Sequence, residues 1–509
     1  MDQGILPLKK PCTTLIIILA VIRPATTALG VAGEIEKATR TRLPAEQTNN
    51  EQVGKQELQY RVCLGWIERI SSKPFQRFSD DISSGWTARC EITDRLVKDY
   101  EDYFAFMKEE HINYIVQWGL FGENWPLDLS TGIPSERAAR IHKILKSAHK
   151  FGIEFLVGFG SNHQMKNILK KYPELAHVDA KGNRSKSKMC PCKPQAKELI
   201  QRTLKSILDE FCVDGLSLEL SRTSSRCRCD YCSSMTDLEH LRAANINLVH
   251  FVRESWPDKA LFIFVPEKTK PDGDLLTYLA ELSKSDVVLD ARWPPEFNAA
   301  YTAIPELRFA MRNFFRCRWI TPPWSWDRLR WFMPQTIQET DGIKLAHKMG
   351  SKGYIWCSSP IANPGVEITA RFRARLCLNP GTDPRECLES VLTDMYKPKT
   401  VEALSTLAGL VREAEKAYPW EKLPLVMHTE IFDYLARLDE KQLEAYETAI
   451  TRVRDDLRKV IGDLGAKNKA DRLLQCLENV LNDTENPPSF PKEVRRRFGT
   501  IPASGRRRR

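Results

Sequence analysis

The feature that most constrains this fold is a regular alternation, beginning near residue 57, of short apolar runs with longer amphipathic segments. The runs are apolar enough for both faces of a strand to be buried, which is typical of parallel sheets covered by helices. We expect strands at 60–68, 112–120, 153–160, 214–220, 260–266, 286–290, 317–323 and 353–359. The helices expected between them include 93–109, 136–151, 195–211, 236–255 and 336–349.

Eight strands that alternate with helices predict an α/β fold in which the sheet closes as a (β/α)8 TIM barrel, at 57–380. A doubly wound open sheet is the alternative, but no glycine-rich phosphate turn follows the first run. From Asp383 onward only helical patterns remain, and Asp383, Pro384 and Glu386 together predict the start of a helix. We therefore expect a smaller all-α domain at 381–485. Its apolar residues at helical spacing predict helix-on-helix packing: Leu443, Tyr446, Ile450, Val453, Leu457, Val460 and Leu464.

The two ends of the chain differ from this body. Residues 1–32 carry Lys9 and Lys10, then an apolar run, then small residues, which is the order of a secretory signal peptide. We therefore expect a secreted or periplasmic protein; a misassigned start or a single membrane anchor are the alternatives. A polar linker follows at 33–56, and no later stretch is apolar enough to predict a transmembrane segment in the mature chain.

Charge is concentrated at the C-terminus. The net charge is +10, and residues 492–509 alone hold seven surplus positive charges, whereas the rest of the chain is nearly balanced. We therefore expect a disordered basic tail at 486–509 and no specific nucleic-acid partner. An arm that binds an anionic surface is the alternative interpretation of the tail. The sequence does not indicate an oligomeric state.

In TIM barrels the chemistry lies at the carboxyl ends of the strands, because the loops that follow the strands gather there. Tryptophans, carboxylates and other polar residues fall at these ends in this sequence. Flat aromatic faces beside charged hydrogen-bonding groups suit a sugar. The predicted substrate-binding residues are Trp66, Glu68, Trp118, Glu123, Asn162, His163, Arg222, Trp293, Trp324, Trp326 and Trp356. The alternative is that several of these tryptophans only plug the top of the barrel.

Glu219 ends an apolar run, "DGLSLEL", and is our candidate general acid, because apolar neighbours raise the pKa of a carboxyl. A structural pair with Arg222 is the alternative. Cleavage of a glycosidic bond usually needs a second carboxylate. Asp290 lies two strands along, at a separation of roughly 9–10 Å before the side chains lean inward, which is closer to an inverting than to a retaining pair. Glu267, one strand along, is the nearer alternative, and Asp290 itself could instead cap a helix or pair with Arg292.

Cysteines follow Glu219 after eight residues. Cys227, Cys229 and Cys232 form a C-x-C-x-x-C loop, and "KMCPCKP" supplies a fourth thiol at Cys190, with Cys192 as a substitute. Four thiolates predict a closed, tetrahedral, structural zinc site that joins the loops after the third and fourth strands. A disulfide with a leftover thiol is the alternative in an oxidising compartment.

The stretch from about 112 to 300 resembles the clan of (β/α)8 glycoside hydrolases, in particular an uncharacterised bacterial group of glycosidase-like barrels. The residues that carry the resemblance are "YPELAHVDAKGNRSKSKMCPCKP", "VDGLSLELS" and "CRCDYC". The cysteine loop is similar to that of the family 42 β-galactosidases, where one cysteine ahead of the strand-four glutamate joins three after it. The resemblance implies that Cys190, Cys227, Cys229 and Cys232 bind the metal and that Glu219 is the acid/base. It does not extend to the glutamate nucleophile of those retaining enzymes, because "WITPPWSWD" contains none.

Three functions follow from these observations. The first is a secreted glycoside hydrolase that acts on a poly- or oligosaccharide, with Glu219 as general acid and inversion favoured. The second is a carbohydrate-binding barrel without activity, which would apply if Glu219 has no second carboxylate within about 10 Å. The third is a zinc-dependent hydrolase, which a closed four-thiolate site disfavours because it leaves no position for water.

Overall fold

A computed structural model describes residues 57–66, 92–121, 133–161, 166–219, 226–265, 273–291, 315–316, 331–348, 351–357, 363–417 and 439–485. All of them belong to one compact unit, Gly54–Arg509. The expected signal peptide, linker and basic tail lie outside these ranges, so they and the domain boundaries stay predictions. Within the ranges that the structure describes, no helix has the length and hydropathy of a membrane span.

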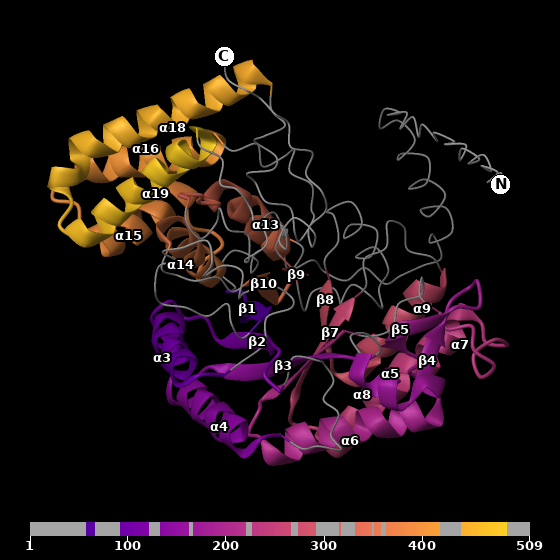
Figure 1. Ribbon diagram of the computed structural model, residues 1–509. Coiled ribbons are helices and arrows are strands. Elements are labelled where there is room, and N and C mark those ends of the chain that lie inside the picture. The colour runs from indigo at the N-terminus through magenta and orange to yellow at the C-terminus, as the bar shows by residue number, and fades with distance from the viewer. Residues whose placement is uncertain are drawn as a thin grey trace, which may run out of the picture. The chain divides into compact units, whose positions relative to one another are not determined.

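The described strands confirm the α/β pattern (Figure 1). Seven expected strands are found close to their predicted positions. They are β1 (Tyr60–Trp66), β2 (Tyr114–Trp118), β3 (Glu154–Gly160), β6 (Gly215–Glu219), β7 (Ala260–Val265), β8 (Val288–Ala291) and β10 (Gly353–Cys357). A two-residue strand, β9 (Phe315–Arg316), precedes the remaining expected strand at 317–323, which lies outside the described residues. All eight are parallel, in the order β8-β7-β6-β3-β2-β1-β10-β9.

This strand order favours the barrel over the doubly wound sheet. The chain moves strand by strand from β1 to β8, and it then enters from the other side at β9 and reaches β1 again through β10. A doubly wound sheet would instead return to the middle and build outward. Within the described residues no ladder joins β8 to β9, although the two edge strands contact each other. The sheet is therefore a curled, parallel half-barrel, and its complete closure stays a prediction.

The curl is shown by rings that meet across the sheet. Tyr60 on β1 and Phe262 on β7 lie four strands apart in the ladder, yet their ring centroids are 5.8 Å apart. In a flat sheet four strand spacings would separate them by roughly 19 Å. The concave face carries a small apolar cluster: Val62, Leu64, Val116, Leu156, Phe262 and Ile355, with Trp118 and Val288 packed against it.

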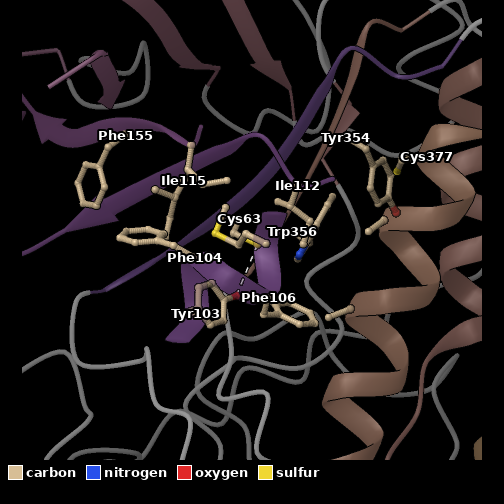
Figure 2. Packing of buried hydrophobic residues seen from close by; sticks show 14 of the residues in the cluster. Cys63, Tyr103, Phe104, Phe106, Ile112, Ile115, Phe155, Tyr354, Trp356 and Cys377 are labelled. Atoms are coloured by element: carbon tan, nitrogen blue, oxygen red, sulfur yellow. Dashed lines mark hydrogen bonds between the residues drawn. The ribbon is translucent and has the colours of Figure 1, made fainter. Parts of the chain in front are cut away.

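The convex face packs against the helices. Here Cys63, Phe155 and Trp356 meet Tyr103, Phe104 and Phe106 of α3 (Asp94–Glu109), and the Tyr103 hydroxyl lies 3.6 Å from Cys63 Sγ (Figure 2). The other helices that follow strands on this side are α4 (Ser135–Lys150), α6 (Pro194–Glu210), α8 (Asn247–Ser255), α9 (Gly273–Leu282) and α13 (Thr336–Lys348). The expected helix at 236–255 is divided into α7 (Asp237–Leu241), a π-helical turn (Arg242–Ile246) and α8.

From Asp383 onward the described elements are helical, as predicted: α15 (Pro384–Tyr396), α16 (Val401–Ala417), α18 (Glu440–Val460) and α19 (Lys467–Glu485). The helix before them, α14 (Pro364–Leu378), follows β10 and lies inside the range expected for the barrel. Asp383 caps α15 by accepting the amides of Arg385 and Glu386, which confirms the expected helix start. The predicted seam is confirmed too, because Tyr446, Ile450, Val453, Leu457 and Leu464 are buried and Leu443 and Val460 are partly buried against them.

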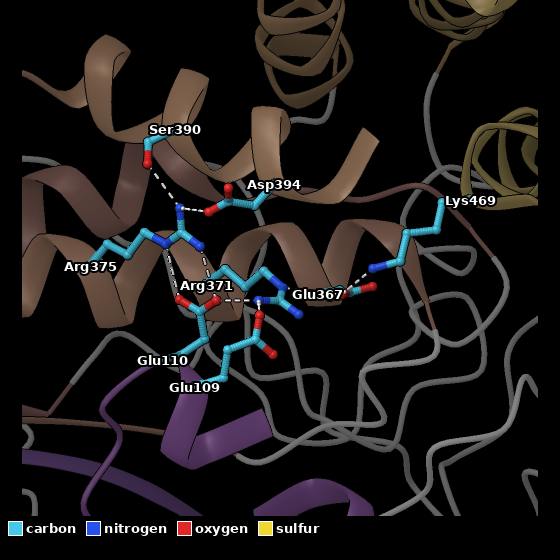
Figure 3. A network of polar contacts seen from close by, with 8 residues as sticks. All are labelled: Glu109, Glu110, Glu367, Arg371, Arg375, Ser390, Asp394 and Lys469. Carbon is cyan, nitrogen blue, oxygen red and sulfur yellow. Dashed lines mark hydrogen bonds and ion pairs between the residues drawn. The ribbon is translucent and has the colours of Figure 1, made fainter. Parts of the chain in front are cut away.

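A polar network joins α3 to this helical part (Figure 3). Glu110, 2% exposed, accepts hydrogen bonds from both Arg371 and Arg375 of α14. Arg375 also reaches Ser390 and Asp394 of α15, at 2.9 and 2.7 Å. Lys469 of α19 pairs with Glu367, the i−4 partner of Arg371. Charged groups that are buried together must satisfy one another, so this network fixes the relative positions of α3, α14, α15 and α19.

Candidate carboxylate site and thiol centre

Glu219 is the last residue of β6, and its side chain lies on the concave face. Leu216 and Leu218 are buried in the convex layer, so by alternation Gly215, Ser217 and Glu219 face the other side. Glu219 is half-buried there, and its carbonyl oxygen accepts the Ser161 amide at 3.1 Å. The predicted candidate acid therefore lies at the carboxyl end of a strand, on the face where a barrel site is built.

Asp290 occupies the same row of the sheet. In the ladder Glu219 pairs with Phe264, and Phe264 pairs with Asp290, so the two acids lie in register with one strand between them. Two strand spacings place their backbones roughly 9–10 Å apart. The same row continues on the other side of Glu219 with Gly160 of β3. The side chain of Asp290, and all of Glu267, lie outside what the structure describes.

One row below, a tryptophan lies beside glycine. Trp118 ends β2 and packs in the concave cluster. Its indole covers the position where a side chain on Gly158 would begin, because a Cβ there would lie 2.6 Å from Trp118 Nε1. Trp66 is the register partner of Trp118 on β1. The concave face of β3 and β6 therefore carries mostly small residues beside and below Glu219, at Gly158, Gly160, Gly215 and Ser217. The indole of Trp118 fills part of the space that they leave.

Trp356 is placed differently from our expectation. It is 2% exposed and packs on the convex side with the helices, whereas its neighbour Ile355 faces the concave cluster. A ring so fully buried offers no face to a sugar, so Trp356 is not part of the site proposed below. The remaining predicted substrate-binding residues lie outside the described residues: Glu68, Glu123, Asn162, His163, Arg222, Trp293, Trp324 and Trp326. Their role stays a prediction.

The four predicted metal ligands come together. The Sγ atoms of Cys190, Cys227, Cys229 and Cys232 all lie within 4.8 Å of one another, and all four residues are buried. Cys190 Sγ lies 3.4 Å from that of Cys232 and 3.8 Å from that of Cys229. A disulfide needs about 2.05 Å, whereas the edge of a tetrahedral zinc–thiolate site is about 3.8 Å. The cysteines are free, and their arrangement fits a metal ion rather than a disulfide.

The thiols are held by two segments that follow neighbouring strands. After β3 and α5 (Lys166–Lys171), the chain forms the hairpin β4 (Ala176–Val178) and β5 (Arg184–Met189), which leads directly to Cys190. Cys227 lies in the connection that follows β6. The Val178 amide donates to Cys227 Sγ at 3.3 Å, and the Arg228 amide donates to the Val178 carbonyl at 2.8 Å. The centre therefore joins the β3 and β6 connections, as predicted.

The thiols also perturb one another's protonation. Hydrogen bonds from Cys192, Cys227 and Cys232 hold the pKa of Cys190 well below its usual range. Sharing protons with that thiolate raises the pKa of Cys192 and of Cys227 to about 12. Several thiolates cannot form side by side in a buried pocket unless a cation compensates them. This donor set therefore suits a soft or borderline divalent metal.

Sequence reasoning missed His240. Its Nε2 accepts the Cys227 amide at 3.4 Å, its Nδ1 is buried without a partner in the described structure, and it forms a second candidate ligand group with Cys192 and Cys232. Burial lowers the pKa of His240, although the Cys190 thiolate opposes this shift. A histidine in the first helical turn after a cysteine loop, at "TDLEH", was the signal available.

Comparisons with known proteins identify no family. No protein-family model matches the sequence, and no curated protein matches it. Among solved structures, an O-GlcNAc hydrolase mutant from Thermobaculum terrenum superposes with a TM-score of 0.44 at 10% identity, over 84% of each chain. The structure named CpGH84B gives a TM-score of 0.44 at 12% identity, over 84% of this chain and 67% of that one. Values this low assign neither a family nor an activity.

Proposed function

We propose that this protein is a glycoside hydrolase with Glu219 as general acid. The observation that carries the proposal is the row Glu219–Phe264–Asp290 at the carboxyl end of the curled sheet, where barrel enzymes place their chemistry. Glu219 donates a proton to the leaving oxygen, and Asp290 takes a proton from the attacking water. The proposed site is therefore made by the sheet itself, which is the most rigid part of the fold.

The separation of the two acids supports inversion. Carboxyl pairs of inverting enzymes lie about 6.5–9.5 Å apart, and those of retaining enzymes about 5–5.5 Å. Backbones roughly 9–10 Å apart leave space for a water between the sugar and the base. A pair of carboxylates on adjacent strands, such as Glu219 with Glu267, would be closer together.

Trp118 is the proposed platform for the sugar ring. It lies on the same face as Glu219, one row deeper, and its indole occupies the space that the missing side chain of Gly158 leaves. An aromatic face placed beneath a carboxyl acid lets axial C–H groups stack while the glycosidic oxygen meets the acid. Trp66, its register partner, extends the same row.

We further propose that the thiol centre holds one structural zinc ion. Cys190, Cys227, Cys229 and Cys232 complete a tetrahedral set, which leaves no coordination position for a reacting water. The metal would fix the connection after β6, which begins at Glu219, to the connection after β3. Export of the protein remains part of this proposal and rests on residues 1–32 alone.

The experiment is a comparison of Glu219→Gln with the wild type on aryl glycosides and polysaccharides. We expect turnover of substrates with poor leaving groups to fall by about 10²–10⁴, because an amide cannot donate the proton. Substrates with very good leaving groups need no such proton and should retain more activity. Glu198→Gln, on the exposed side of α6, is the matched control and should behave as the wild type.

Two results would contradict the proposal. Near-normal turnover by Glu219→Gln on a natural glycan would remove Glu219 from the chemistry. Binding of a glycan by the wild type with no turnover of any substrate would instead identify a carbohydrate-binding barrel without activity.

A further inference from the structure

A second feature near the site is a concentration of positive charge. Residues 166–193 contain eight lysines and arginines against two acids, a surplus of six. The whole chain has a net charge of +10, of which seven lie in the last eighteen residues. The body outside 166–193 is therefore slightly acidic on balance, and residues 166–193 are a strongly basic stretch within it.

The strand β5 presents three of these charges on one face. Along β5, Arg184, Lys186 and Lys188 are exposed, while Ser185 and Ser187 between them are partly buried. Alternate residues of a strand are about 6.8 Å apart, so the three cations form a regular row. Within the described residues Lys186 and Lys188 form no ion pair, and Arg184 reaches only the Pro173 carbonyl at 3.4 Å. The row is thus left available for an external anion.

The row is held rigidly. Asp179 closes the hairpin turn by accepting the amides of Lys181 and Asn183 at 2.8 and 2.9 Å, and Gly182 supplies the left-handed residue, with φ of 81°. At its other end the hairpin enters the thiol centre through Cys190. A binding surface that is already ordered loses little conformational entropy when a ligand binds.

The topology places the row in the connection that follows β3, at the same end of the sheet as Glu219. The hairpin is part of the connection that follows β3, and β3 ends at Gly160, the ladder neighbour of Glu219. Connections after parallel strands lie at the carboxyl end of the sheet. The thiol centre then joins the hairpin to the loop that leaves Glu219.

We propose that Arg184, Lys186 and Lys188 bind an anionic polysaccharide and direct it to the Glu219 site. This inference rests on the proposed function and names its substrate class. A polymer with one acid group on successive or alternate sugars matches a row of cations better than a single small anion does. A single-stranded nucleic acid is disfavoured, because such sites combine cations with aromatic stacking platforms, and residues 179–193 contain no aromatic residue.

The test measures binding by the full chain and by the triple variant Arg184→Gln, Lys186→Gln, Lys188→Gln. The probes are polygalacturonate and its carboxyl-reduced form, dextran sulfate and dextran, and a single-stranded oligonucleotide. Lys143→Gln, Lys146→Gln, Lys205→Gln is the control variant. It removes the same charge from exposed sites on α4 and α6 and leaves the basic tail intact.

We expect the wild type and the control to bind at least one acidic polysaccharide, with an affinity that falls as salt is added. Affinity should fall about tenfold in the hairpin variant, as the loss of three modest ion pairs implies. The acidic polymer that responds identifies carboxylate or sulfate as the recognised group. Melting temperatures of the three proteins should agree, because the changed side chains are exposed.

Equal affinities of the hairpin and control variants for both acidic polymers would overturn the inference. So would equal binding of an acidic polymer and its neutral form, or hairpin-dependent binding of the oligonucleotide as tight as that of the polysaccharide. The inference and the proposed function fail separately. Glu219→Gln should reduce turnover of substrates with poor leaving groups without changing this binding, whereas loss of the hairpin charges should leave turnover of small neutral aryl glycosides unchanged.

Discussion

The indole of Trp118 lies over Gly158, at the place where any larger residue would put its Cβ. The two residues occupy neighbouring strands on the concave face, one row below Glu219. Gly158 is therefore required by the tryptophan and not by its own backbone. If Trp118 stacks against the sugar, the missing side chain at Gly158 determines how deep in the site the indole lies.

Gly158→Ala should displace Trp118. We expect a loss of about 1–3 kcal/mol of stability from overpacking, together with a change in tryptophan fluorescence. Gly409→Ala is the control: Gly409 lies in α16 with nothing within 4 Å of its Cβ position, so alanine should stabilise the helix by about 0.5–1 kcal/mol. Urea unfolding followed by fluorescence measures both. If Gly158→Ala is as stable as the wild type, the indole moves freely and does not form a rigid platform.

The thiol centre predicts about one zinc ion per chain and a large effect of removing one ligand. Cys229→Ser should lower the melting temperature by several degrees, because binding of a structural metal is coupled to folding. Cys212→Ser is the matched control, since Cys212 is an exposed free thiol. Metal analysis of the purified protein and thermal unfolding check this prediction. Metal-free protein of wild-type stability, or a Cys227–Cys232 disulfide found by mass spectrometry, would contradict it.

A prediction about stability alone concerns the buried carboxylate of Glu110. Burial would by itself lower the pKa of Arg371, but hydrogen bonding and charge from Glu109, Glu367 and Glu110 raise it above its ordinary value. Glu110→Gln leaves Arg371 and Arg375 without their shared charge, and we expect a loss of about 3–5 kcal/mol. Glu413→Gln breaks an exposed pair with Arg452 and should cost less than about 1 kcal/mol. Similar midpoints of urea unfolding for the two variants would show that the buried network adds no stability.

The sequence was sufficient to predict the helices and strands, but not which face of the sheet each strand residue lies on. Seven strands and the cap at Asp383 could be predicted because apolar runs and capping residues are local signals. A strand buried on both faces shows no period-two pattern, so nothing local distinguishes Trp356, on the convex side, from Ile355, on the concave side. Packing against the helices resolves this ambiguity, and the register of β6, β7 and β8 then places Glu219 and Asp290 in one row.

The thiol centre shows the same limit. The C-x-C-x-x-C spacing was enough to predict three ligands, and "KMCPCKP" a fourth, because ligands close in sequence are close in space. His240 depends on where α7 packs after the loop, which is a tertiary contact. The strand β5 (Arg184–Met189) was not predicted either, since its alternating cations and serines resemble a solvated loop until β4 pairs with it.

Asp290 carries the last prediction. If Asp290 activates the water in the row that it shares with Glu219, Asp290→Asn should reduce turnover of good and poor leaving groups alike, by about 10²–10⁴, because attack of water is needed for both. Asp258→Asn, in the exposed turn before β7, is the control. The first product released by the wild type should have the opposite anomeric configuration to the substrate, which proton NMR during hydrolysis can follow. Retained configuration, or an Asp290→Asn variant that is impaired only toward poor leaving groups, would transfer the second carboxylate role to Glu267 or another acid.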